Sequence, residues 1–372
     1  MNKIKVITVF GTRPEGIKMA PIIKAMENVS EIENTICITA QHREMLDQVL
    51  NLFKIEPDYD LNIFKPGQSL TEITMRALEG LEKVLIEVKP DVLLVQGDTS
   101  TVFAGALAAF YQKVKIGHVE AGLRSGNLYS PYPEEANRKL TGILTDYHFA
   151  PTETNKENLL REGYPEEKIF ITGNTVIDAL HYAVKEDYNF HIPILNKINY
   201  IDKRVILLTS HRRENIGKPM ENIFSAVKDI VLKHQDVEVV FPIHLNPKVR
   251  DIAYKIFEDN ERIHLIEPLD YEPFTNLMAK CHLVITDSGG LQEEAPSLGK
   301  PVLVVREETE RPEGIEAGTA KLVGTEYEPI FREIDILLSN KDEYINMANA
   351  VNPYGDGKAS EKIVDIILKY MG

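Results

Sequence analysis

The fold class is decided by residues 91–120, DVLLVQGDTSTVFAGALAAFYQKVKIGHVE. Two short strand-like segments, at 91–96 and 113–120, flank a polar turn and a segment with helical spacing. A short strand that is apolar along its whole length is typical of a parallel sheet covered on both faces, because neither face then meets water. The stretch therefore predicts a strand, a crossover helix and a second strand of an α/β fold.

The same alternation of strands and helices occurs on both sides of this stretch. Before it, the pattern predicts strands at 5–10 and 35–40 and a long amphipathic helix at 69–90. After it, strands are predicted at 204–210, 237–243, 263–268, 282–287 and 301–306, each followed by a helical segment. Segment 191–203 has no clean period and is predicted to be a linker. The pattern indicates two Rossmann-like, doubly wound α/β domains with a boundary within 170–203.

Composition excludes several classes of function. With 372 residues, 43% of them hydrophobic and 27% charged, the chain is expected to fold as two domains of ordinary size. The net charge of -15 argues against a nucleic-acid surface and against an anionic membrane partner. Cys37 and Cys281 form no CxxC motif or disulfide framework, which favours the reducing cytoplasm. We expect no secretion signal and no membrane span, since no run approaches the roughly 18 apolar residues required.

Polar and charged side chains follow the predicted strands in both halves of the chain. They include Arg13, Asp98, Glu120, His211, His244 and Ser288. Ligands of open parallel sheets bind beyond the carboxyl ends of the strands. Two such sheets facing each other would therefore place these residues around a cleft between the domains.

Two strand-to-helix turns carry phosphate-binding features. DSGGLQEEA at 287–295 offers two glycines at a helix start, and Glu293 or Glu294 could bind ribose hydroxyls. FGTRPEGIK at 10–18 places Arg13 and Lys18 at another helix start, where a diphosphate would be favoured. The alternatives are a tight turn capped by Asp or Ser and a first-turn surface arginine.

Two further stretches concentrate charge. HVEAGLRSGNLYSPYPEEANRKL at 118–140 gathers carboxylates, a histidine and arginines, and SHRREN at 210–215 offers cations to a leaving phosphate or is a solvated basic turn. ETERPEG at 308–314 alone suggests a surface loop.

Fingerprints of common cofactors are missing from the sequence. No GxGxxG occurs, so no nicotinamide cofactor is predicted. The segment 355–358 lacks the flanking residues of a P-loop, and the Asp58-Tyr59-Asp60 triplet stands alone. The histidines show no metal-ligand spacing, so no metal is predicted.

Taken together, several motifs resemble the non-hydrolysing UDP-N-acetylglucosamine 2-epimerases. They are FGTRPE, QGDTST, HVEAGLR, PEEANR, ITGNTVID, HRREN, DSGGLQEEAPSLGKPVLVVR and ERPEG, in family order from Lys3 to about Lys369. The resemblance implies a GT-B fold: a first domain at 1–175, a UDP-binding domain at 176–357, and a final helix at 358–372 that packs back on the first domain. It implies a cytoplasmic homodimer that needs neither NAD nor a metal.

The family interconverts UDP-N-acetylglucosamine (UDP-GlcNAc) and UDP-N-acetylmannosamine (UDP-ManNAc), which feeds cell-surface polysaccharide synthesis. Its route is elimination of UDP to 2-acetamidoglucal, followed by re-addition. The matching catalytic positions are Asp98, Glu120, Glu134 and His211. The matching substrate-binding positions are Arg13, Lys18, His244, Phe274, Ser288, Gly289, Gly290, Glu294 and Arg311. A second UDP-GlcNAc site of many bacterial members corresponds to Gln41, Glu44, Glu134, Arg212 and His244, although some members have other residues at Glu44 and Gly67.

Three alternative functions remain compatible with the residues. A hydrolysing epimerase would release free N-acetylmannosamine, and a GT-B glycosyltransferase would leave UDP-GlcNAc unchanged without an acceptor. A nucleotide-sugar-binding regulator would need no carboxylate cluster, so Asp98, Glu120 and Glu134 argue against it.

Overall fold

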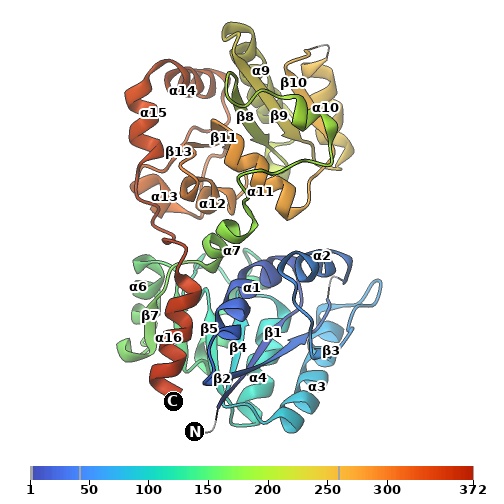
Figure 1. The fold of residues 1–372 in the computed structure, drawn as a ribbon, viewed down its shortest axis with the longest axis vertical. Coiled ribbons are helices and arrows are strands. Elements are labelled where there is room, and N and C mark those ends of the chain that lie inside the picture. Colours follow the sequence, from blue (N-terminus) through green and yellow to red (C-terminus); the bar gives the residue numbers. More distant parts are fainter. Residues whose placement is uncertain (1–2, 42, 259, 372) are drawn as a thin grey trace. The chain divides into compact units, whose positions relative to one another are not determined.

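The computed structural model describes residues 3–41, 43–258 and 260–371, which form two compact α/β units (Figure 1). Unit 1 comprises residues 1–182 and 354–372, and unit 2 comprises 183–353. The boundaries between the two compact units lie at 182/183 and 353/354. Each is a few residues from the expected domain limits at 175 and 358. The reason lies in helix α7 (Thr175–Ala183), whose Ile177, Ala179 and Leu180 are buried and whose Tyr182 stacks on Phe53 of unit 1.

Unit 1 contains a parallel sheet of seven strands within the described residues, in the order β3-β2-β1-β4-β5-β6-β7. The strands are β1 (Ile4–Phe10), β2 (Ile32–Ile38), β3 (Tyr59–Asp60), β4 (Val92–Gln96), β5 (Lys115–Val119), β6 (Tyr147–Ala150) and β7 (Ile169–Ile171). The helices are α1 (Arg13–Glu27), α2 (Arg43–Phe53), α3 (Leu70–Val88), α4 (Ser100–Tyr111), α5 (Glu134–Leu144), α6 (Glu153–Arg161), α7 and α16 (Ala359–Met371), with a 3-10 turn η1 (Glu166–Lys168). The order is that of a Rossmann sheet with one strand added.

Unit 2 repeats this architecture with six parallel strands in its described part, in the order β10-β9-β8-β11-β12-β13. The strands are β8 (Arg204–Thr209), β9 (Val237–Pro242), β10 (Ile263–Ile266), β11 (Leu283–Thr286), β12 (Val302–Val304) and β13 (Ala320–Leu322). The helices are α8 (Pro193–Lys197), α9 (Lys218–Lys233), α10 (Pro247–Phe257), α11 (Tyr271–Lys280), α12 (Leu291–Ser297), α13 (Pro312–Glu316), α14 (Tyr327–Ser339) and α15 (Lys341–Ala348), with a 3-10 turn η2 (Arg213–Asn215).

The predicted fold class of two Rossmann-like, doubly wound domains is confirmed. Each predicted strand is present, as is the long helix α3. Four strands were not predicted, namely β3, β6, β7 and β13, and each has only two to four residues. The predicted linker at 191–203 is not a bare connection, because it contains α8 and buries Leu195 completely.

The helix at the carboxyl end packs on unit 1, beside α1 (Figure 1). Asp178 of α7 accepts hydrogen bonds from the backbone N–H groups of Ala359 and Ser360, at 3.2 and 2.7 Å. These are the first helical residues of α16, whose N–H groups have no partner within the helix. A carboxylate at this end of a helix is also favoured by the helix dipole. Among the described residues, no helix has the length and apolarity needed to cross a membrane.

Candidate functional site

The carboxyl edge of the first sheet brings together three predicted site residues. Strands β1, β4 and β5 are neighbours (Figure 1). Arg13, Asp98 and Glu120 follow these strands in turn. Arg13 is the first residue of α1 and is half-buried. Because parallel strands end at the same edge, one polar residue after each of three adjacent strands makes a compact polar surface.

The Glu120 carboxylate is largely buried and is fixed by contacts with three side chains. Its side chain is 10% exposed, and the Nζ atom of Lys18 lies 2.6 Å from both carboxylate oxygens. The amide of Gln96 donates to Oε2, and that of Asn174 donates to Oε1 at 3.2 Å. The backbone of Glu120 has φ of 64°, in the left-handed region that non-glycine residues rarely occupy. Strain of this kind gathers at functional sites, where the surroundings enforce it.

Asp98 is oriented by two residues of α5. Arg138 donates to its Oδ2 from Nε at 2.9 Å, with Nη2 2.6 Å from the same oxygen, and the Asn137 amide donates to its backbone carbonyl at 2.9 Å. Its turn is held from β5, since His118 Nε2 donates to the carbonyl of Gly97 at 2.7 Å. Burial lowers the pKa of His118 to about 4, so this ring is neutral at pH 7 and acts as a structural donor.

The two glutamates that begin α5 have different surroundings. Glu135 is fully buried and accepts the N–H groups of Ser125 and Gly126, at 3.0 and 3.2 Å, so it fixes the loop before α5. Glu134 is half-exposed, and its side chain has no hydrogen bond or ion pair to any other described residue. Only Glu134 of the pair is therefore available to a ligand.

Glu15 was not predicted from the sequence as a site residue, yet it connects two loops of the site. It is fully buried on α1; its Oε2 accepts the N–H groups of Gly11 and Thr12, and its Oε1 accepts the hydroxyl of Thr99 at 2.5 Å. It thus joins the loop before Arg13 to the turn after Asp98. Burial raises the pKa of Glu15, against the opposing effect of these hydrogen bonds. The sequence signal was the capping-box spacing from Thr12 to Glu15.

A Glu15→Gln variant should be the more stable chain at neutral pH. A carboxyl group whose pKa rises on folding stabilises the fold below its unfolded pKa of 4.5, and that contribution is lost as pH rises through the folded pKa. The loss is about 1.4 kcal/mol per unit of pKa shift, and the amide does not suffer it. Urea unfolding at pH 4.5 and 7.5 should show the variant gaining on the parent as pH rises. The exposed Glu56→Gln change is the control, and equal pH dependence in all three chains would contradict the expectation.

Two of the residues predicted for a second ligand site, Gln41 and Glu44, lie near the start of α2. Gln41 is half-buried and its Oε1 lies 3.4 Å from the Thr101 hydroxyl, whereas Glu44 is exposed in the first turn of the helix. The remaining members are Glu134 at the start of α5 and, in unit 2, Arg212 and His244.

In unit 2 the residues after β8 and β9 come together. The rings of His211 and His244 stack with centroids 5.7 Å apart and 22° between their planes. His211 Nδ1 lies 3.1 Å from Oδ1 of Asp287, the first residue after β11. Burial and the neighbouring His211 lower the pKa of His244. Arg212 donates from Nε to the carbonyl of Asp287 at 3.3 Å.

The turn after β11 leaves space above its glycines. A methyl group added at Gly289 would meet no atom within 4 Å, and one at Gly290 would lie 3.4 Å from Oε1 of Glu294. The turn is not capped by Asp287 or Ser288, because α12 has no side-chain cap and Asp287 points toward the loop after β8.

Phe274 of α11 is half-buried. Arg311 is hydrogen-bonded to the buried Glu293, so the charge-dense 308–314 segment is anchored.

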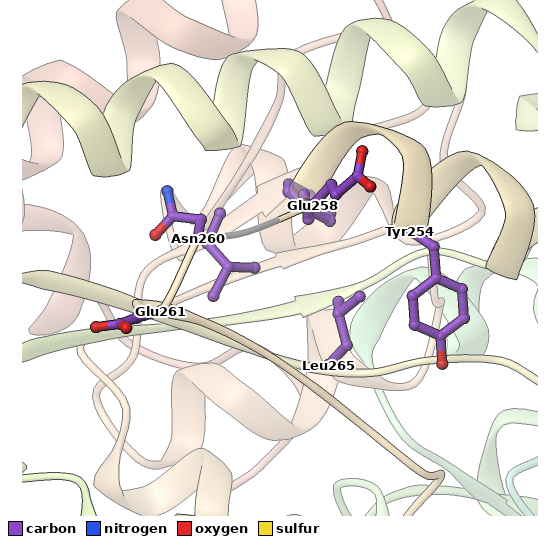
Figure 2. Close-up of a pocket in the computed structure, with 7 residues that line it drawn as sticks. Tyr254, Glu258, Asn260, Glu261 and Leu265 are labelled. Carbon is purple, nitrogen blue, oxygen red and sulfur yellow. The ribbon is translucent and has the colours of Figure 1, made fainter.

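A surface hollow of about 650 Å³ in unit 2 contains none of these residues (Figure 2). It is lined by Tyr254, Phe257, Glu258, Asn260, Glu261, Ile263 and Leu265. These residues end α10 and begin β10, so the hollow lies away from the carboxyl ends of the strands.

The described residues also contain no cluster of three or more potential metal ligands. Asp58 accepts from the N–H of Ile36 at 2.7 Å and Asp60 pairs with Arg43, so both have structural partners.

Comparison with known proteins identifies the family. The sequence profile of the UDP-N-acetylglucosamine 2-epimerase family matches residues 24–368. This chain belongs to the UDP-N-acetylglucosamine 2-epimerase family. It is 56% identical to the UDP-N-acetylglucosamine 2-epimerase of Bacillus subtilis over 372 residues, which cover 100% of this chain and 97% of the relative. The Escherichia coli K12 protein of that name is 54% identical over 98% of each chain.

A solved structure supports the same family assignment. The UDP-GlcNAc 2-epimerase of Neisseria meningitidis, solved bound to UDP-GlcNAc, is similar with a TM-score of 0.86 and 52% identity. The match covers 98% of this chain and 100% of that one. The predicted UDP-N-acetylglucosamine 2-epimerase family and the GT-B fold class are therefore confirmed.

Proposed function

We propose that this epimerase interconverts UDP-GlcNAc and UDP-ManNAc by inverting C2 without releasing a free sugar. The observation that carries the proposal is the placement of Asp98 and Glu120 after the adjacent strands β4 and β5 in a member of this family. The Neisseria relative with UDP-GlcNAc bound supports the choice of substrate.

The C2 proton of the sugar is not adjacent to a carbonyl, so its removal alone gives no resonance-stabilised product. In the proposed route the C1–O bond breaks, its electron pair leaves with the diphosphate oxygen of UDP, and C2 loses its proton to a carboxylate. The C1=C2 double bond of 2-acetamidoglucal forms. The UDP oxygen then adds back at C1 while a proton reaches the opposite face of C2.

This chemistry assigns roles to the polar residues of both units. Asp98 and Glu120 move the proton at C2 and steady oxocarbenium-like charge, with Glu134 assisting. His211 serves the departing diphosphate. Lys18, which contacts Glu120 in unit 1, supplies positive charge next to that carboxylate.

The UDP group is proposed to bind mainly through unit 2. Phe274 stacks on uracil, Glu294 accepts from the ribose, and Ser288, Gly289 and Gly290 meet the phosphates. The open space above Gly289 supports this assignment. Further contacts are assigned to Arg13, Lys18, His244 and Arg311.

A proton NMR time course of UDP-GlcNAc in deuterated water, with the purified chain alone, tests the proposal. We expect UDP-ManNAc to form with deuterium at C2. Free N-acetylmannosamine would instead identify a hydrolysing epimerase. Absence of exchange at C2 in a folded chain that binds UDP would overturn the proposal in favour of a glycosyltransferase or a binding protein.

We further infer regulation by the substrate at a second site formed by Gln41, Glu44, Arg212 and His244. Starting from pure UDP-ManNAc, turnover should then accelerate when a trace of UDP-GlcNAc is added.

We also propose a cytoplasmic homodimer that uses no NAD and no metal and supplies ManNAc for cell-surface polysaccharides. Light scattering tests the dimer, and an unchanged rate after chelation and gel filtration tests the cofactor assignment.

A further inference from the structure

The carboxylate of Asp287 is fully buried directly after β11, and it serves the loop that carries His211. Its Oδ2 accepts the backbone N–H groups of His211 and Arg212, at 2.8 and 3.0 Å. The same oxygen accepts the Ser210 hydroxyl at 3.0 Å and the Asn215 amide at 3.1 Å. One oxygen therefore fixes the backbone of the whole loop from 210 to 215.

The second oxygen of Asp287 faces one imidazole nitrogen. Oδ1 is buried, accepts no hydrogen bond from the other described residues, and has His211 Nδ1 as its neighbour at 3.1 Å. Burial alone would raise the pKa of Asp287, but His211 and the backbone N–H groups outweigh it and the pKa is lowered. Asp287 is thus an anion at neutral pH. A carboxylate can only accept a hydrogen bond, so a hydrogen bond across this contact requires a proton on Nδ1 of His211.

The register of the sheet makes this pairing rigid. Strands β8 and β11 are adjacent and parallel, with Thr209 opposite Thr286 and their hydroxyls 2.7 Å apart. The residues that follow the two strands therefore meet at the same sheet edge. The His211 side chain remains 40% exposed, and His244 stacks on its ring. With Nδ1 engaged, Nε2 is the ring nitrogen left for a ligand.

We propose that Asp287 is a positioning residue for the reaction, which holds His211 with its proton on Nδ1 and its Nε2 directed to the substrate. The inference rests on the proposed function, in which His211 serves the departing diphosphate. Asp287 would stabilise the imidazolium form while Nε2–H donates to the diphosphate oxygen. Buried carboxylates commonly fix histidine tautomers in this way.

An Asp287→Asn variant tests the positioning role. The amide oxygen can keep the backbone contacts, but its NH₂ group would face His211 and demand an unprotonated Nδ1. We expect the rate of C2 exchange to fall about 100-fold, while UDP binding changes only a few-fold. The matched control is Asn215→Ser, which removes one amide donor to the same carboxylate and should leave the rate within a few-fold.

A double-mutant cycle separates positioning from structural damage. If Asp287 acts through His211, Asp287→Asn should cost little further rate in a His211→Asn background. Independent, multiplicative losses would overturn the proposal. The comparison uses only chains that still bind UDP.

A spectroscopic readout does not depend on turnover. In ¹⁵N-histidine spectra of the parent chain, assigned with His211→Asn, the Nδ1 atom of His211 should carry a proton near neutral pH. An unprotonated Nδ1 would overturn the pairing even if no Asp287 variant folds. If the parent chain shows the protonated Nδ1 but exchanges no C2 proton, the proposed function fails while the Asp287 contact stands.

Discussion

A Glu120→Gln variant is expected to lose about 1,000-fold in the rate of C2 exchange, because a neutral amide cannot take or return the C2 proton. The fold should survive, since the amide oxygen can still accept from Asn174 and the Gln96 side chain can turn its own oxygen toward the new NH₂ group. Lys18 would lose the anion that lies 2.6 Å from its ammonium group, which removes a charge pair from the proposed site. The measurement is deuterium incorporation at C2 of UDP-GlcNAc under saturating substrate.

The matched control is Glu166→Gln in the same unit. Glu166 pairs with Lys156 but is 70% exposed, so it offers the same chemical change far from any strand end of the site. It should leave the exchange rate unchanged. UDP affinity is measured in parallel by calorimetry, because a loss of binding would be a different defect. A Glu120→Gln chain that exchanges at the parent rate would remove Glu120 from the proton-transfer step.

The carboxylate-rich stretch 118–140 shows which site residues could be predicted from the sequence and which could not. Its charge density predicted a site, and Glu120 and Glu134 are the two of its carboxylates to which we assign roles in the proposed reaction. Other charged residues of the stretch have structural roles. Glu135 is fully buried beneath the loop that it fixes, and Arg124 donates to both carboxylate oxygens of Glu162. Residue type and spacing could not separate these roles, since burial depends on contacts with distant segments.

The fold was predictable where strands were long and apolar, and was missed where they were short. β6 and β13 are examples, because His148 and Lys321 interrupt runs of only three or four residues. The roles of Asp287 and Glu15 were not predicted from the sequence, for a related reason. The contacts of Asp287 with residues 210–215 and of Glu15 with Thr99 join loops that are distant in sequence and are brought together by the strand order.

His148 should make unit 1 sensitive to acid. It lies on β6 opposite His118 of β5, fully buried, and neither ring nitrogen has a hydrogen-bond partner among the described residues. Burial, with smaller effects from His118, Arg124 and Lys168, lowers its pKa from 6.5 to about 3. A base whose pKa falls on folding stabilises the fold above its unfolded pKa, and this contribution is lost as pH drops from 6.5 toward 3. At about 1.4 kcal/mol per unit, the loss amounts to several kcal/mol.

A His148→Leu variant should remove this part of the acid sensitivity. Leucine has a similar volume and no polar atoms, and it can pack on Tyr164, whose ring centroid lies 4.7 Å from that of His148. We expect the variant to match or exceed the parent in free energy of unfolding at pH 8 and to exceed it increasingly as pH falls from 6.5 to 4.5. The exposed His181→Gln change in the same unit should leave the acid profile unaltered. Parallel pH profiles for the parent and His148→Leu, from urea unfolding, would mean that His148 is protonated or solvated in the native state.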